Sequence, residues 1–249
     1  IDMPQFDADR EEVVARAREA GLVEMLVVGG VDEASGHRRA LEVAGRFGLP
    51  ATAGVHPHEA RIATEAVYDE LRGLAREGRI VAIGEIGLDF HYDHSPREVQ
   101  REVFRRQIRL AREVDLPIVV HTREADGETA DILEQEGASE AGGVIHCFTG
   151  GLDLARRSLD LGFLISFSGI VAFPRAEVIQ QVAREVPADR LLVETDAPFL
   201  APPPHRGKRN EPAFVVDVAR KVAALRGTTP EALGTLAREN YARLFRRAV

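Results

Sequence analysis

Seven short apolar runs alternate with longer amphipathic stretches along the chain. The runs are mostly continuous in apolar character and are bounded by glycine, proline or polar residues, which is typical of strands buried on both faces of a parallel sheet. The predicted strands are 23–30, 50–56, 80–87, 117–122, 142–148, 163–169 and 190–196. Because the stretches between them have helical periodicity, the chain is predicted to repeat strand–helix units.

Two of the amphipathic stretches show helix signals most clearly. The first, DREEVVARAREAG, begins at Asp9, and Glu12 follows three residues later, as in a capping box. It ends at Gly21, a residue type common at helix C-termini. The second is REVQREVFRRQIRLAREV. Two further helical segments, roughly 211–226 and 230–246, follow the last predicted strand.

Repeated strand–helix units can close into a (β/α)₈ barrel, and 249 residues is a common length for one. Residues 1–249 are therefore predicted to form a single TIM-barrel domain of the α/β class. A barrel needs eight strands and normally begins with one, whereas this chain begins with a predicted helix. We therefore expect the first strand to be missing from this chain, with a gap or a short stub in its place. An open, seven-stranded, doubly wound sheet is the structural alternative.

Four predicted strands carry a histidine or a carboxylate at or near their C-terminal ends. These residues are Glu85, His121, His146 and Asp196. In a barrel, the C-terminal strand ends and the loops after them form the active-site face. Each signal is weak alone, since such residues often follow strands, but four at equivalent positions are difficult to explain as helix caps. The set of two imidazoles and two carboxylates suits Zn²⁺, Mn²⁺, Mg²⁺ or Fe²⁺.

A divalent ion at this face would promote hydrolysis, because it lowers the pKa of bound water and polarises a phosphoryl or carbonyl oxygen. Asp196 is predicted both to bind the ion and to accept the proton of the attacking water. Glu85 is predicted to bridge two ions if two are bound. One or two divalent ions, Mg²⁺, Mn²⁺ or Zn²⁺, are therefore the expected cofactors.

Other residues near these strand ends are candidates for substrate contact. His56 in GVHPH is predicted to lie in the pocket, whereas His58 suits the pocket and the loop surface equally. Asp89 would either orient a metal ligand or stabilise a turn. Arg123, two residues after His121, could meet a phosphate. The segment HRGKR, which contains Arg206, would be either a solvated loop or an anion pocket, and its place after Asp196 favours the pocket.

The composition limits the kinds of partner and the cellular location that we expect for this protein. The net charge of −8 argues against broad binding of duplex DNA through a basic face, although capture of one or two phosphates stays open. The single cysteine, Cys147, is typical of a reducing cytoplasm and is predicted to be a buried filler rather than a nucleophile. No apolar run approaches the ~20 residues of a membrane helix.

Five motifs together resemble one known family. GVHPH, GEIGLDF, HTRE, HCFTG and ETDAPFLAPPPHRGKRNEP, in this order and spacing, are similar to those of the TatD-type metal-dependent deoxyribonucleases of the amidohydrolase superfamily. The closing LARENYARLF also resembles the end of that family, so the resemblance covers the whole chain.

The resemblance implies a TIM barrel that hydrolyses DNA phosphodiesters at a one- or two-metal centre. It places the bridging carboxylate at Glu85 and further metal ligands at His121, His146 and Asp196. His56, Asp89 and Arg206 match family positions that contact the substrate or support the ligands. The family also begins with a strand that ends in a His-x-His pair of metal ligands, and this sequence lacks both.

Three functions follow as hypotheses. The first is a nuclease that acts on single-stranded or damaged DNA ends, because the acidic charge favours local end recognition. The second is a metal-dependent hydrolase that cleaves another ester, an amide or an aminoacyl bond. The third is a degenerate barrel that binds nucleic acid or another partner without hydrolysis.

Overall fold

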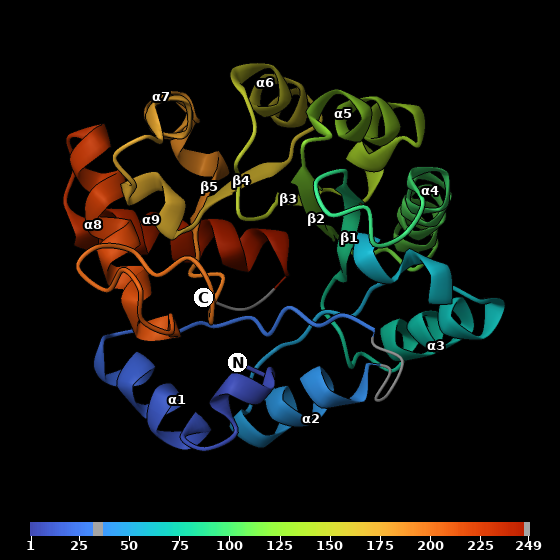
Figure 1. Cartoon of the computed structure of the whole chain (residues 1–249), viewed down its shortest axis with the longest axis horizontal. Coiled ribbons are helices and arrows are strands. Elements are labelled where there is room, and N and C mark those ends of the chain that lie inside the picture. The colour runs from blue at the N-terminus through green and yellow to red at the C-terminus, as the bar shows by residue number, and fades with distance from the viewer. Residues whose placement is uncertain (32–36, 247–249) are drawn as a thin grey trace.

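A computed structural model describes residues 1–31 and 37–246 (Figure 1). Its regular strands form a parallel sheet of five, in the order β1-β2-β3-β4-β5, so neighbours in the sequence are neighbours in the sheet. Their bounds are β1 Ile83–Asp89, β2 Ile118–Arg123, β3 Gly143–Ile145, β4 Leu164–Phe167 and β5 Leu191–Val193. This order is the one that successive strand–helix units of a barrel produce.

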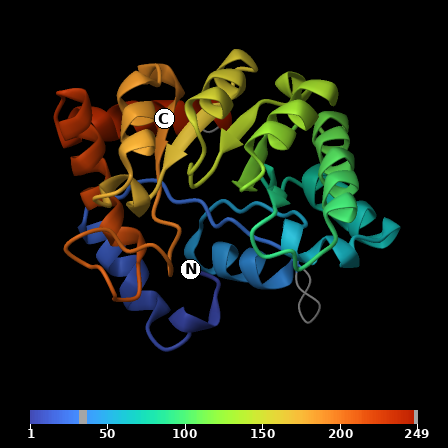
Figure 2. The same cartoon turned by 45° about the horizontal axis from the view of Figure 1, so that its top comes forward.

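The helices surround the strands (Figures 1 and 2). The α-helices are α1 Arg10–Glu19, α2 Arg38–Phe47, α3 Glu65–Arg76, α4 Arg97–Glu113, α5 Asp126–Gln135, α6 Leu152–Asp160, α7 Glu177–Glu185, α8 Val215–Arg226 and α9 Pro230–Leu244. Short 3₁₀ helices lie at Pro4–Phe6, Pro57–Ile62, Ala138–Glu140, Gly169–Ala172, Ala188–Arg190 and Pro212–Phe214. The fold is therefore the predicted α/β barrel type.

The first two predicted strands, 23–30 and 50–56, are not regular strands, and this corrects the count of seven. They are extended, and each contributes to isolated parallel bridges: Val27 pairs with Ala51, and Ala53 pairs with Ile83 of β1. These bridges keep the order of a barrel, because 23–30 lies beside 50–56 and 50–56 lies beside β1. Within the described residues, 23–30 is paired along one edge alone, so a continuous ladder does not form there.

A cavity of about 1970 Å³ separates the other edge of 23–30 from β5. The segment from Leu22 to Gly30 and the segment from Leu192 to Ala197 both line it. In the described part of the chain, no backbone hydrogen bond joins these two segments.

Helix α1 begins at the predicted place without the predicted capping box. Asp9 is the N-cap residue, but its side chain makes no capping hydrogen bond. Its carboxylate instead accepts hydrogen bonds from Arg209, at 2.6 and 2.7 Å, and from Arg16 at 3.4 Å. The bonds to Arg209 join a carboxylate to a guanidinium of opposite charge, so Asp9 attaches α1 to the loop that follows β5.

Gly87 lies where β1 and β2 approach each other closely. Its φ is +143°, and a Cβ atom there would lie 2.0 Å from the carbonyl oxygen of His121. Gly87→Ala should therefore lower the free energy of unfolding by at least ~2 kcal/mol, because both conformation and packing oppose a side chain.

Urea denaturation measures this effect, and Gly73→Ala is the matched control. Gly73 lies inside α3, and a Cβ atom there would meet nothing within 4 Å. The control should stabilise the protein by about 0.5–1 kcal/mol, because alanine is the better helix former. Equal stability of the Gly87 variant and the unsubstituted protein would contradict the close approach.

Candidate metal centre

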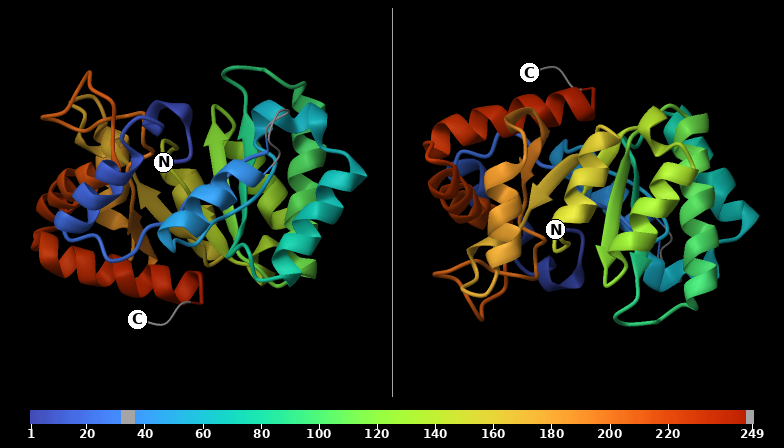
Figure 3. Two further views of the ribbon diagram at one scale, coloured as in Figure 1. Left: turned by 90° about the horizontal axis from the view of Figure 1, so that it is seen from below. Right: turned by 90° about the horizontal axis from the view of Figure 1, so that it is seen from above.

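An apolar layer inside the barrel forms the floor of the site. Its members are buried, come mainly from successive strands and pack together: Ala82, Val119, Val144, Leu164, Leu192 and Phe245. Phe245 follows α9, which lies along the end of the barrel opposite the loops after β1 and β5 (Figure 3). Side chains two residues apart on a strand point to the same face. The next inward positions are therefore polar: His121, His146 and Glu194.

Glu85 reaches the centre through an irregularity in β1. Gly84 pairs with Val119, and Ile86 pairs with the next residue, Val120, so Glu85 is an extra residue between them. A β-bulge of this kind redirects one side chain. The backbone N–H of Glu85 donates to the carbonyl of Gly29 at 3.2 Å, which ties the bulge to the segment 23–30.

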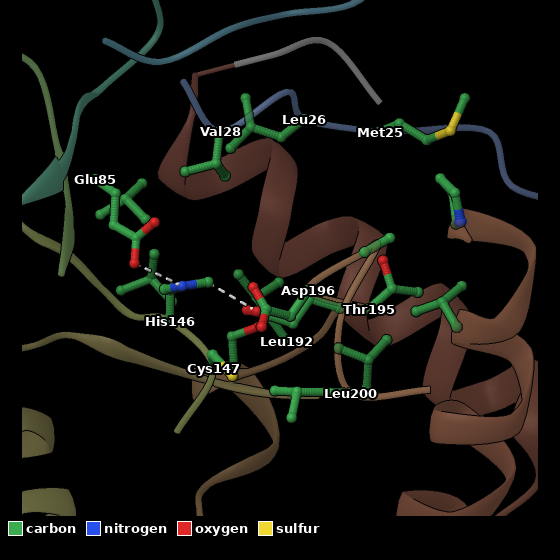
Figure 4. A pocket seen from close by; sticks show the side chains of 18 of the residues that line it. Met25, Leu26, Val28, Glu85, His146, Cys147, Leu192, Thr195, Asp196 and Leu200 are labelled. Atoms are coloured by element: carbon green, nitrogen blue, oxygen red, sulfur yellow. Dashed lines mark ion pairs between the residues drawn. The ribbon is translucent and has the colours of Figure 1, made fainter. Parts of the chain in front are cut away.

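The Glu85 carboxylate contacts histidines from three parts of the chain. Its Oε1 lies 2.9 Å from His121 Nδ1, 2.9 Å from His146 Nε2 and 3.7 Å from His56 Nε2. Figure 4 shows His146 between Glu85 and Asp196. Burial raises the pKa of Glu85, but the charge of His146 and hydrogen bonds from His121 and His146 outweigh it, and the pKa lies well below its usual range.

Asp89 supports the histidines from the end of β1. Its Oδ2 lies 3.1 Å from His121 Nε2 and 3.0 Å from His58 Nε2. Its Oδ1 accepts the backbone N–H groups of His91 and Tyr92, both at 3.0 Å. Burial tends to raise the pKa of Asp89, but these hydrogen bonds have the larger effect, and the pKa lies below its usual range. The carboxylate therefore stays ionised and fixes the ring of His121.

Glu194 was not among the predicted site residues. Its Oε1 lies 2.8 Å from His146 Nδ1, so His146 contacts Glu194 on one side and Glu85 on the other. Leu192 belongs to the apolar layer, and alternation along the strand directs Glu194 inward two residues later. That alternation is the sequence signal that could have identified Glu194.

The carboxylates at the end of β5 are crowded. Burial raises the pKa of Asp196 to about 7; His146 opposes the rise, and Glu194 and Glu85 add to it. The pKa of His146 lies well above its usual value, because Glu194 and Glu85 outweigh the effect of burial. Such a partly buried group of acids beside an imidazole favours a cation among them.

The remaining histidines of the site differ in their surroundings. Burial lowers the pKa of His56 to about 3, against the opposing charge of Glu85, so its imidazole is neutral and able to bind a metal. Burial also lowers the pKa of His121, but hydrogen bonds to Asp89 and Glu85 outweigh it and raise the pKa to about 8.

Two groups of side chains have the spacing of metal ligands. His56, Glu85 and His121 form one, and His146, Glu194 and Asp196 form the other. Within each group the ligand atoms all lie within 4.8 Å of one another. Imidazole nitrogen with carboxylate oxygen is a donor set that divalent ions such as Zn²⁺ and Mn²⁺ accept, so the residues fit a metal.

The four predicted ligands, Glu85, His121, His146 and Asp196, thus all line the same cavity, with Glu194 and His56 beside them. His58 and Asp89 line it as well. Cys147 is partly buried, and its thiol donates to Ser168 Oγ at 3.2 Å. Burial raises the pKa of this thiol well above its usual value, in keeping with a buried filler.

The two predicted phosphate-binding arginines lie in different surroundings. Arg123 lines the cavity, and its guanidinium lies 4.7 Å from the ring centre of Tyr92. Arg206 is not among the described residues that line the cavity, and its guanidinium lies 3.8 Å from the ring centre of Phe173. His205 lies in the same loop as Arg206, and its Nε2 lies 3.1 Å from Oδ2 of Asp217 in α8.

The barrel and its paired ligand groups define a metal-dependent hydrolase. The chain belongs to the family described as TatD related DNase, whose model matches residues 1–246. Across the described residues, no helix combines the length and apolar character that crossing a bilayer requires.

Curated relatives span nearly the whole chain. A Bacillus subtilis protein named uncharacterized metal-dependent hydrolase YabD is 45% identical, over 99% of this chain and 96% of its own length. A Pantoea vagans protein named 3′-5′ ssDNA/RNA exonuclease TatD is 41% identical, over 98% of this chain and 96% of its own length. The crystal structure of YJJV, a TatD homolog from Escherichia coli K12, has a TM-score of 0.91 at 30% identity and covers 99% of this chain and 95% of that chain.

Proposed function

We propose that this protein is a metal-dependent deoxyribonuclease that cleaves phosphodiester bonds of single-stranded DNA or DNA ends. The observation that carries the proposal is the pair of adjacent ligand groups in one cavity, joined by His146, which contacts both Glu85 and Glu194. The name of the Pantoea vagans relative, a 3′-5′ ssDNA/RNA exonuclease, supports the choice of substrate. The single cysteine supports a cytoplasmic location.

His56, Glu85 and His121 would hold one divalent ion, Mg²⁺, Mn²⁺ or Zn²⁺, and His146, Glu194 and Asp196 would hold a second. A bound ion would lower the pKa of a water molecule and polarise a phosphoryl oxygen. Glu85 lies close to His56, His121 and His146, which suits the bridging role proposed for it.

The side chains around the ligands have supporting roles. Asp196 is the proposed acceptor of the proton that the attacking water releases. Asp89 holds the rings of His58 and His121 by hydrogen bonds of 3.0 and 3.1 Å, which keeps the ligand His121 in one orientation.

Arg123 lines the cavity, as does Arg238 of α9, and it lies two residues after the proposed ligand His121 in β2. Arg123→Ala should raise KM for a DNA substrate at least about fivefold and change kcat less, because an arginine on a non-reacting phosphate binds ground and transition states alike. Arg206→Ala is the matched comparison, since Arg206 was predicted to bind substrate from the sequence but packs on Phe173. Steady-state kinetics on a single-stranded oligonucleotide measures both; a larger KM effect for Arg206 would reverse the assignment.

Product analysis tests the proposed function directly. The protein is reconstituted with Mg²⁺, Mn²⁺ or Zn²⁺ and incubated with single-stranded DNA, with methyl p-nitrophenyl phosphate and with p-nitrophenyl acetate. Hydrolysis of both phosphodiesters supports the nuclease. Turnover of the carboxylic ester alone would favour the second hypothesis, and DNA binding without any turnover would favour the non-catalytic barrel.

A further inference from the structure

Two aromatic rings are strongly exposed at the mouth of the cavity. Within the described chain, the large hydrophobic side chains that are more than half exposed are Val23, Tyr92, Val178 and Phe199. Tyr92 is 51% exposed and Phe199 is 52% exposed, and both line the cavity that holds the proposed metal ligands. Val178 is equally exposed but does not line it.

The two rings belong to loops that follow the first and the last strand of the five-stranded sheet. Tyr92 belongs to the loop after β1, and Phe199 belongs to the loop after β5. These strands are the two edges of the sheet, and their loops project from the same end of the barrel (Figure 3). A chain that crossed the cavity from one loop to the other would therefore pass the proposed metal centre.

Tyr92 is held in place by its neighbours, and it is 51% exposed. Its backbone N–H donates to Asp89 Oδ1 at 3.0 Å. The guanidinium of Arg123 lies 4.7 Å from the ring centre, and the ring of His94 is nearly parallel to it, at 5.5 Å. These contacts reduce the freedom of the ring, so a ligand that stacks on it has less conformational entropy to remove.

The backbone of Phe199 is fixed in a similar way. Its N–H donates to the carbonyl of Asp196 at 2.9 Å, and its own carbonyl accepts a hydrogen bond of 2.6 Å from the amide of Asn210. Asn210 is fully buried and also donates to the carbonyl of Thr195 at 2.7 Å. The loop is therefore anchored from below while the phenyl ring faces solvent at the rim.

We infer that Tyr92 and Phe199 each stack on a nucleobase, one on either side of the scissile phosphate of a single DNA strand. This inference rests on the proposed nuclease function and adds to it the groups that select an unpaired strand. Aromatic side chains bind unpaired bases through their faces, whereas in a duplex those faces are covered by neighbouring bases. Stacking also suits a chain with a net charge of −8, because it provides affinity without a broad basic surface.

Leucine substitutions test the inference, since leucine keeps an apolar side chain of similar reach and lacks a π face. Tyr92→Leu and Phe199→Leu should each lower kcat/KM for a single-stranded oligonucleotide about tenfold. The fall for an oligonucleotide that is abasic on both sides of the cleaved bond, and so has no base there to stack, should be at least fivefold smaller. Tyr92→Phe should restore most of the activity on DNA, and Val178→Ala should behave as the unsubstituted protein. Equal losses on both substrates would overturn the inference.

Oligonucleotides with one abasic nucleotide locate each contact. The abasic position is placed directly 5′ or directly 3′ of the cleaved bond, and each leucine variant is compared with the unsubstituted protein on both strands. The effect of one variant should disappear on one strand, and the effect of the other variant on the other strand; either pairing supports the inference. Loss of both effects on the same strand, or of neither, contradicts it.

The same assays separate this inference from the proposed function. If the unsubstituted protein hydrolyses neither the oligonucleotide nor methyl p-nitrophenyl phosphate with any of the three ions, the proposed function itself fails. If it hydrolyses both and the leucine variants match it on DNA, the nuclease stands and the stacking contacts do not. Thermal melting of each variant confirms that the folded state is retained.

Discussion

Asp196→Asn should reduce kcat for phosphodiester hydrolysis by at least about 10²–10⁴-fold, with little change in thermal stability. Loss of general-base catalysis alone has this magnitude, and a weaker metal ligand would add to it. The carboxylate lies in a partly buried group with His146 and Glu194, where asparagine preserves the shape of the side chain but removes its charge and most of its basicity. We expect the barrel to fold, because the substitution is nearly isosteric.

Initial rates with methyl p-nitrophenyl phosphate at saturating metal measure this effect. Asp189→Asn is the matched control, since Asp189 is an exposed acid just before β5, outside the cavity lining. The control should keep full activity. An Asp196 variant that retained more than half of the original turnover would remove Asp196 from the mechanism.

Removal of divalent ions should abolish hydrolysis and lower the melting temperature. A ligand that binds the folded state at about 100 times its Kd stabilises that state by ~2.7 kcal/mol. In a chain of 249 residues each kcal/mol corresponds to roughly 2–4 °C, so metal should raise the melting temperature by about 5–10 °C. The crowded acids at the end of β5 are a further reason to expect stabilisation, because a cation would relieve their repulsion.

Glu85→Gln separates metal binding from a general effect of salt. Glu85 lies within 3.7 Å of three histidines, so its loss should remove most of the metal-induced rise in melting temperature. Glu124→Gln is the matched control: Glu124 also lines the cavity, but it pairs with His91 and belongs to neither ligand group. Melting curves with and without chelator measure both variants. An equal metal response in the two would refute the proposed ligand role of Glu85.

Much of the fold could be predicted because it follows from the pattern of apolar and polar residues within short segments of the chain. Continuous apolar runs separated by amphipathic stretches predicted five of the strands and the barrel class, since a parallel strand must be buried on both faces. The two runs that did not form regular strands, 23–30 and 50–56, have the same apolar pattern, but their backbones pair only at isolated bridges, Val27 with Ala51 and Ala53 with Ile83. Pairing between distant segments cannot be read from the pattern of one segment.

The site also has features that the sequence predicted and features that only the structure shows. The placement of Glu85, His121, His146 and Asp196 in one cavity followed from their positions at strand ends, because parallel strands end at one face of the barrel. The bulge at Glu85 and the hydrogen bonds from Asp89 to His58 and His121 required the assembled structure.

The sequence by itself determined the barrel class and the polar side chains at the strand ends, because both depend on local periodicity. Only the tertiary structure decided which partner each long side chain finds. Asp9 pairs with Arg209 instead of capping its helix, and Arg206 packs on Phe173. Flexible charged side chains can reach several partners in the unfolded chain, and folding selects among them by bringing distant loops together.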